Sequence, residues 1–314
     1  MIKKKGTSAG LDIGDSSVKL VELARTSEGL ELASFGVAQI NGKGKDAVID
    51  AIKRVIKETP GSIHRVNVAV FGESVIVRYI DLPRMTKAEL ASAIKYEAEQ
   101  YLPLKMDEVN FDFYPLEEIP GNKVKVLLVA ARKELINEQI DIIKSAGLFP
   151  GIIDIDSFCL INCFEMNGPK VLNEDTAALL HIGHGTTSVN ILKGNIPYFT
   201  RDIYIGTSHI TEDGELKEIL EEPPIALGNL LSEVRLCFDH YENQTEKNVG
   251  LIYLSGGGTT LKGLSHVIHT QLGVEAKVWD PLTNIKIDHS KFDMDKLKEV
   301  GPILPVGIGL ALRR

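Results

Sequence analysis

Residues 11–23 constrain the fold of this chain most, because apolar and polar residues alternate along them on both sides of a Gly-Asp-Ser-Ser centre. Alternation with a period of two is typical of half-buried strands, and the centre favours a tight turn. The pattern therefore predicts a β-hairpin. Gly14 lets a backbone approach a bulky ligand, and Ser16 and Ser17 offer hydroxyl and amide donors that suit phosphate oxygens. An ordinary surface hairpin is the alternative interpretation at this point.

Two later stretches repeat or extend this design. Residues 179–192 again predict a strand, a glycine-rich tip and a strand, and residues 251–260 predict a buried strand, a triple glycine and the start of a helix. The residues of these two centres are Gly183, Gly185, Thr186 and Thr187 in the first, and Gly256, Gly257, Gly258 and Thr259 in the second.

In this order, the three motifs resemble those of the actin-like ATPase family. The resemblance implies that ATP and Mg²⁺ are cofactors, that the hairpins straddle the phosphates and that the glycine turn lies against the adenosine. Asp12 is the implied metal residue, holding Mg²⁺ directly or through water. The implied phosphate-binding residues are Asp12, Gly14, Ser16, Ser17, Lys19, Gly183, Gly185, Thr186 and Thr187; the implied adenosine-binding residues are Gly256, Gly257, Gly258, Thr259, Glu215 and Lys217.

Further stretches narrow the resemblance to the PilM family of type IV pilus assembly, whose members are related to the division protein FtsA. They are residues 82–85 before 93–104, residues 154–158, and the glycine-rich end at 301–313. The match covers nearly the whole chain and is weak over about 207–231. Glu215 and Lys217 lie in this weak part, and a solvated helix face is their alternative interpretation.

The fold class expected from this resemblance is α/β, an actin-like (ribonuclease-H-like) fold of two lobes with an FtsA-type 1C insertion and a shortened second lobe. A length of 314 residues suits two lobes better than one core. The strand predicted at 75–82 is assigned to the first lobe. The expected boundaries are 1–84 for subdomain 1A, 85–151 for the insertion, 152–174 for the return to 1A with an inter-lobe helix, 175–280 for lobe 2 with a reduced 2B at about 207–231, and 281–314 for a segment packing back on lobe 1.

Composition excludes several classes of protein. The 43 acidic residues outnumber the 35 basic ones, which argues against a nucleic-acid partner. The longest apolar run, near residues 303–312, is too short to span a bilayer, so we expect no direct membrane insertion. The 3 cysteines form no disulfide or metal pattern, which fits a reducing cytoplasm.

Asp156 begins the predicted inter-lobe helix, and the resemblance implies that it positions the attacking water. Its alternative role is to complement the helix dipole. His181 stands where relatives carry the aspartate of the second hairpin, and an imidazole cannot supply that negative charge. We therefore expect that the protein binds ATP and that it hydrolyses ATP weakly or not at all. The alternative is a degenerate scaffold, a pseudo-ATPase that binds no nucleotide.

The resemblance also implies partners at a membrane. It predicts that the cytoplasmic tail of a PilN-like membrane protein binds between the first lobe and the insertion, with other pilus assembly proteins and self-association as further contacts. The protein would then be cytoplasmic and peripheral at the inner membrane through its partner. Thr86 and Glu89 predict a capping box for a helix that carries Tyr96 and Tyr101. These tyrosines and Phe111 are the expected groove residues, unless the tyrosines merely close the core of the subdomain.

Overall fold

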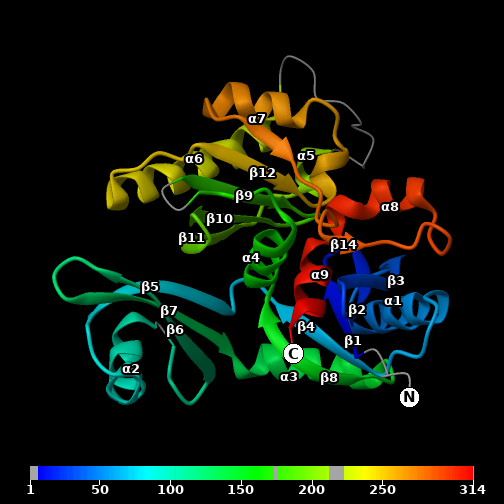
Figure 1. The fold of residues 1–314 in the computed structure, drawn as a ribbon, viewed down its shortest axis with the longest axis horizontal. Helices are drawn as coiled ribbons and strands as arrows, with labels where there is room; N and C mark the ends of the chain where they lie inside the picture. Colours follow the sequence, from blue (N-terminus) through cyan, green and yellow to red (C-terminus); the bar gives the residue numbers. More distant parts are fainter. Residues whose placement is uncertain (1–5, 103, 173–174, 212–222, 314) are drawn as a thin grey trace. The chain divides into compact units, whose positions relative to one another are not determined.

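The computed structural model describes residues 6–102, 104–172, 175–211 and 223–313 of the chain. It consists of two compact units, Met1–Ala69 with Ile142–Arg314, and Val70–Asp141. Figure 1 gives the element labels used below.

The first sheet of the first unit has the order β14-β3-β2-β1-β4-β8 in the described residues. The strands β1 and β2 form the predicted hairpin, with Asp12 paired directly to Lys19. The helix α1 (Lys45–Glu58) buries Ile52 and Val55 in a core shared with Leu11 of β1. The strands are β1 (Thr7–Ile13), β2 (Ser17–Thr26), β3 (Gly29–Gln39), β4 (Arg65–Val70), β8 (Phe149–Ile155) and β14 (Ile285–Lys286).

The second sheet of this unit has the order β11-β10-β9-β12-β13 in the described residues. Its two faces bury different residues of one strand, because side chains alternate along β9. Leu180 faces a core with α6 and α7, whereas Leu179 faces a core shared with α4. The elements are β9 (Thr176–Ile182), β10 (Thr187–Lys193), β11 (Ile196–Ile203), β12 (Leu251–Ser255), β13 (Ala276–Val278), α4 (Asp156–Asn167), α5 (Thr207–Ile210), α6 (Ile225–Thr245), η2 (Gly257–Thr260) and α7 (Leu264–Leu272).

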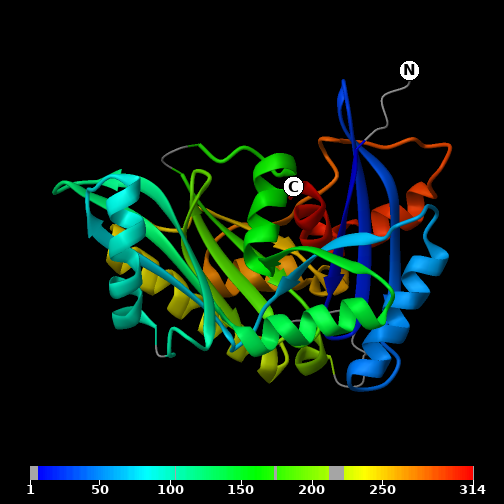
Figure 2. The same cartoon turned by 90° about the horizontal axis from the view of Figure 1, so that it is seen from below.

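The helix α9 (Pro305–Leu312) joins the core between the two sheets of this unit, after α8 (Met294–Val300) and η3 (Gly301–Ile303). Figure 2 shows α9 beside α4. Glycines permit this close packing: a Cβ added to Gly309 would lie 1.9 Å from the Cys159 carbonyl oxygen, and one added to Gly10 would lie 2.1 Å from that of Gly307. The predicted packing of the carboxyl-terminal segment on the first lobe thus depends on positions that tolerate no side chain.

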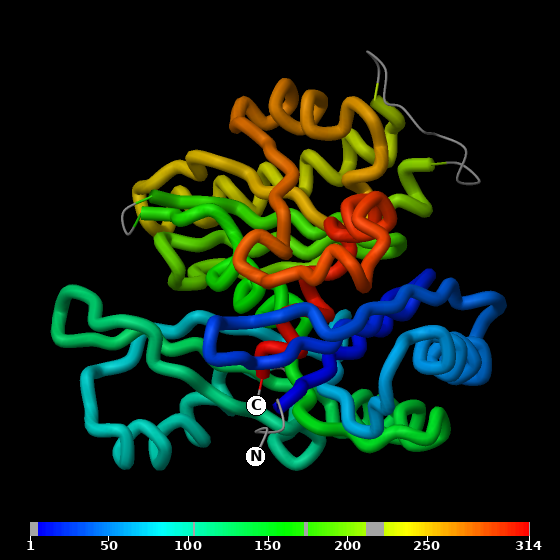
Figure 3. Tube along the Cα trace, turned by 45° about the vertical axis from the view of Figure 1, so that its right-hand side comes forward, coloured from blue at the N-terminus to red at the C-terminus, as the bar shows by residue number. Residues whose placement is uncertain are grey.

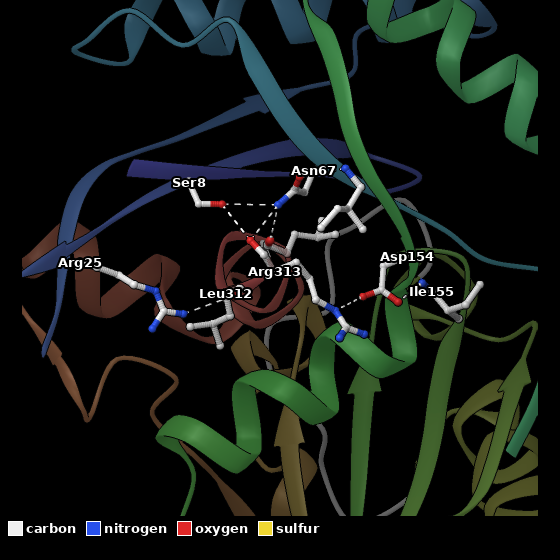
Figure 4. A network of polar contacts seen from close by, with 9 residues as sticks. Ser8, Arg25, Asn67, Asp154, Ile155, Leu312 and Arg313 are labelled. Carbon is white, nitrogen blue, oxygen red and sulfur yellow. Dashed lines mark hydrogen bonds and ion pairs between the residues drawn. The ribbon is translucent and has the colours of Figure 1, made fainter. Parts of the chain in front are cut away.

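Asn67 ties α9 into the first sheet (Figure 4). Its side-chain amide nitrogen donates to the Leu310 carbonyl at 3.0 Å, while its amide oxygen accepts from the Ile152 amide at 3.0 Å. Ser8 donates to the Arg313 carbonyl at 3.2 Å, and Arg313 also pairs with Asp154. The start of β1 and the end of α9 therefore lie side by side, as the tube in Figure 3 shows.

The second unit is a sheet of order β5-β7-β6 with helix α2. The predicted capping box is confirmed: the Thr86 hydroxyl accepts from the Glu89 amide at 3.3 Å, and the Glu89 carboxylate accepts from the Thr86 amide at 2.7 Å. Leu90 and Ile94 of α2 pack against the sheet. The elements are β5 (Val75–Pro83), α2 (Lys87–Tyr101), β6 (Val109–Ile119), β7 (Lys123–Arg132) and α3 (Lys133–Ser145), the last of which runs into the first unit.

One predicted assignment is wrong. Residues 75–82, expected as a strand of the first lobe, form β5, which pairs with β7 inside the second unit. The expected boundary between residues 84 and 85 therefore differs from the observed unit, which begins at Val70. Local alternation predicts a strand but carries no information about its partner, which explains the error.

Candidate functional site

The two predicted hairpins are both present, and their tips have the same turn. The Gly14 amide donates to the Ser17 carbonyl at 3.1 Å, and the Gly183 amide donates to the Thr186 carbonyl at 2.9 Å. The tips meet, because the Gly185 amide donates to Asp15 Oδ2 at 3.1 Å. Two glycine-rich turns of this kind, brought together within one unit, concentrate backbone amides at one place, as an anion site requires.

Asp12 and Lys19 form an ion pair beside the first tip. Their atoms Oδ2 and Nζ are 3.2 Å apart, and both side chains are nearly buried, with 12% and 13% of their surface exposed. They are direct cross-strand partners in the hairpin. A carboxylate and an ammonium at this position are the charges that a hydrated metal ion and a phosphate would need.

The glycine turn packs on the strand that leads into the second tip. A Cβ added to Gly256, whose φ is +87°, would lie 2.4 Å from the Ile182 carbonyl oxygen, and one added to Gly258 would lie 2.6 Å from the Ile182 side chain. At Gly257, no heavy atom of the described residues outside its immediate neighbours lies within 4 Å of such a Cβ. Two of the three glycines therefore serve packing, and the third borders open space. The Thr259 hydroxyl closes the turn by donating to the Gly256 carbonyl at 2.8 Å.

A row of polar residues crosses the second sheet next to the tip of the second hairpin. Asp202, Ser188, His181 and Ser255 are successive register partners on β11, β10, β9 and β12. The Ser188 hydroxyl donates to Asp202 Oδ1 at 2.7 Å, and His181 Nδ1 lies 3.0 Å from the Ser255 hydroxyl. Partners in register share a face of the sheet, so these four side chains form one continuous polar strip.

His181 is neutral at physiological pH. Burial lowers the pKa of His181 to about 4; the Asp12 carboxylate opposes this shift, and the Lys19 ammonium adds to it. The imidazole thus brings no positive charge to the site, and it also lacks the negative charge that an aspartate would bring there.

Asp156 stands at the start of α4, as predicted, and its surroundings disfavour the ionised form of its carboxyl. Burial raises the pKa of Asp156 well above the ordinary value, and the Asp202 and Asp12 carboxylates raise it further. The Ser157 amide, which donates to Asp156 Oδ1 at 2.6 Å, opposes the shift. The Asp202 and Asp12 carboxylates therefore both disfavour ionisation of Asp156.

The described residues contain no group of three or more His, Cys, Asp or Glu placed to hold a metal ion. The carboxylates of the site fit a magnesium ion held mainly by nucleotide phosphates and water, since Mg²⁺ typically takes only one or two protein carboxylates in such sites.

The expected partner residues belong to the second unit. Tyr96 and Tyr101 are 76% and 40% exposed on α2. Phe111 on β6 is partly buried and packs against the core of the unit. The exposure of Tyr96 excludes the alternative that this side chain closes the core. Glu215 and Lys217 lie outside the described residues.

Four residues of the site were not predicted from sequence: Asp15, Ser188, Asp202 and Ser255. Asp15 lies within the first tip, where its position alone could have indicated a contact with a second tip. Ser255 directly precedes the glycine turn. Nothing in the local sequence marks Ser188 or Asp202, whose pairing comes from the register of β10 with β11.

In the described residues, no helix combines the length and the apolar character that crossing a membrane requires.

The fold is shared with solved structures. The ethanolamine utilization protein EutJ from Carboxydothermus hydrogenoformans matches with a TM-score of 0.53 at 13% identity, over 98% of this chain and 89% of that one. A structure described as the PilM-PilN type IV pilus biogenesis complex matches with a TM-score of 0.83 at 27% identity, over 98% of both chains. The fold is therefore actin-like, and it carries two hairpins with equivalent tips.

The family follows from sequence. The chain matches the family described as type IV pilus assembly protein PilM over residues 10–216 and 217–314. It therefore belongs to the PilM family and is an actin-like protein of type IV pilus assembly.

Proposed function

We propose that this pilus assembly protein binds ATP with Mg²⁺ between its two hairpin tips. One observation carries the proposal: the contact between Asp15 and Gly185 joins two equivalent turns, each preceded by a buried strand. The glycine turn at Gly257 borders open space next to the second hairpin. A phosphate anchor and an uncrowded glycine surface for the nucleoside are thus neighbours in one unit.

Each group of the nucleotide has residues of suitable chemistry. Backbone amides of the tips, including Thr186 and Thr187, would donate to phosphate oxygens, as would that of Gly185 once Asp15 releases it. Lys19 would add positive charge. Asp12 would act on Mg²⁺ directly or through water. When bound, Mg²⁺ supplies charge neutralisation of the phosphates. The neutral His181, which brings no negative charge to the site, supports weak or absent hydrolysis.

Calorimetric titration of the protein with ATP tests this proposal. Saturable binding that weakens when EDTA replaces Mg²⁺ is the expected result. The absence of binding at about 1 mM ATP, a concentration that would detect even a Kd in the millimolar range, would favour the degenerate scaffold instead. Folding of the sample is checked by circular dichroism in both cases.

The proposed protein partner is the cytoplasmic tail of a PilN-like membrane protein. The structure described as a PilM-PilN complex supports it through a 27% identity that extends over 98% of both chains. In the second unit, β6 is an edge strand in the described sheet, and it exposes Tyr114. An extended tail could pair with such an edge and place apolar side chains against exposed aromatic ones. The protein would thereby reside in the cytoplasm, at the inner membrane; further pilus proteins and self-association belong to the same proposal.

A synthetic PilN tail titrated against Tyr96→Ala and Tyr101→Ala tests the docking surface. Loss of one aromatic anchor costs about 2 kcal/mol, so we expect binding to weaken more than tenfold. Tyr204→Ala, which removes a 48% exposed tyrosine from the first unit, is the matched control and should bind as the parent does. If both α2 variants bind the tail as tightly as the parent protein, this surface is not the docking site. If the parent protein itself does not bind the tail, the proposed partner is wrong.

A further inference from the structure

The second hairpin lacks a carboxylate where the actin-like pattern places one, yet a carboxylate is present on the same face of the same sheet. Position 181 on β9 is a histidine, and its register partner on β10 is Ser188. The register partner of Ser188 on β11 is Asp202. The negative charge thus lies two strands away from the expected strand, at the same level of the sheet.

A hydrogen bond fixes the orientation of this carboxylate. The buried Ser188 hydroxyl donates to Asp202 Oδ1 at 2.7 Å, which settles one oxygen of Asp202. Asp202 is partly buried, so its charge is less screened by solvent than that of a surface aspartate.

Asp202 acts on the residues of the nucleotide site. Its carboxylate raises the pKa of Asp156, as does that of Asp12 on the first hairpin. Two carboxylates from different sheets therefore act on the start of the same helix, α4. His181 lies between Ser188 and Ser255 in the polar strip, and burial keeps it neutral.

We propose that Asp202 is the positioning carboxylate of the second lobe, supplying from β11 the negative charge toward hydrated Mg²⁺ that position 181 on β9 lacks. The inference rests on the proposed nucleotide binding and deepens it. The competing explanation is a purely structural role, in which Asp202 serves as the hydrogen-bond acceptor of the Ser188 hydroxyl and does not act on Mg²⁺.

Asp202→Asn separates these two roles, because asparagine keeps an oxygen acceptor for Ser188 and loses the charge. The measurement is calorimetric titration with ATP, with Mg²⁺ and then with EDTA, so that the readout is affinity and not turnover. We expect the gain in ATP affinity caused by Mg²⁺ to fall about tenfold, the size typical of losing a residue that supports a metal ion through other groups. Affinity in EDTA should not fall, because losing a negative charge removes repulsion of the phosphates.

A second variant tests whether the position of the charge can be exchanged. The double variant Asp202→Asn with His181→Asp removes the carboxylate from β11 and places one on β9, in the same polar strip. It should restore most of the gain in ATP affinity caused by Mg²⁺. Asp239→Asn on the exposed face of α6 changes the net charge equally and should leave the effect unchanged. If folded Asp202→Asn retains the full Mg²⁺ effect, Asp202 only satisfies Ser188 and the inference is overturned. If the parent binds no ATP in either buffer, the nucleotide proposal itself fails.

Discussion

Asp15 on the first hairpin accepts a hydrogen bond from the Gly185 amide on the second, with Oδ2 and nitrogen 3.1 Å apart. The carboxylate thereby occupies a backbone donor of the kind that phosphate oxygens use. A nucleotide phosphate and the Asp15 carboxylate would compete for this donor and would also repel each other. The contact therefore holds the tips together and, at the same time, opposes the proposed ligand.

Replacing Asp15 by alanine should strengthen ATP binding. The change frees the Gly185 amide and removes one negative charge beside the phosphates, so we expect Kd to fall about three- to tenfold, or about 0.7–1.4 kcal/mol. The same calorimetric titration measures it. Asp46→Ala, an exposed acidic residue of α1, is the control for net charge. Weaker binding by Asp15→Ala would mean that the contact instead helps to close the tips around the nucleotide.

Replacing Gly257 by phenylalanine should weaken ATP binding by tenfold or more, which corresponds to about 1.4 kcal/mol. The added ring enters the open space beside the turn, where the nucleoside is expected, and Gly257→Ala should have little effect because it adds a single carbon. Neither variant meets a described heavy atom at the Cβ position, so both should fold. Unchanged affinity of the folded phenylalanine variant would show that the adenosine lies elsewhere.

His181 should make the protein less stable in acid. Its pKa is about 4 in the folded state against an ordinary 6.5, so the unfolded chain takes up the proton first as the pH falls. The stability contributed by neutral His181 is present above pH 6.5 and is lost as the pH falls to about 4. At about 1.4 kcal/mol per pKa unit, the loss is about 3 kcal/mol.

The variant His181→Asn isolates this effect, because asparagine does not titrate. Urea unfolding at pH 7 and pH 4 should show that the free energy of unfolding falls more steeply for the parent than for the variant. Asp156 shifts in the opposite sense, since its raised pKa favours stability in acid, but it is present in both proteins and largely cancels. Equal pH dependence of the two proteins would show that the pKa of His181 is not lowered in the folded state.

The tyrosines of α2 should contribute little to stability. Tyr96→Ala removes a side chain that is 76% exposed, so the free energy of unfolding should change by about 0.5 kcal/mol or less. Ile94→Ala, two residues earlier and 1% exposed, should cost about 2–5 kcal/mol. Urea unfolding measures both. A cost above about 2 kcal/mol for Tyr96→Ala would place this ring in a core and exclude it as a docking residue.

Sequence predicted the parts of this fold that depend on neighbouring residues. Both hairpins follow from alternation around glycine tips, and the start of α2 follows from Thr86 and Glu89, because turns and caps are set within a few residues. The pairing of β5 could not be predicted in the same way. It depends on β7, which lies about 40 residues further along the chain.

The residues of the candidate site also divide into those that the local sequence predicts and those that depend on distant parts of the chain. The amide-rich tips and the carboxylate of Asp12 were predicted from their own motifs, whereas the role inferred for Asp202 depends on strand register and on the buried environment of His181. The replacement inferred for the missing charge involves a residue outside every motif. It could be inferred only once the strands are placed side by side.

The bonds between β1 and the end of α9 join residues made at very different times on the ribosome. Ser8 and Arg313, which share a hydrogen bond, are 305 positions apart. At a synthesis rate of about 5–20 residues per second, β1 waits roughly 15–60 s for α9. Isolated hairpins form in about 1–10 μs but are only marginally stable in water, so speed of formation does not limit the first hairpin and the absence of its apolar cover does. Until then, Val21 lacks the part of its core that Ile308 later contributes.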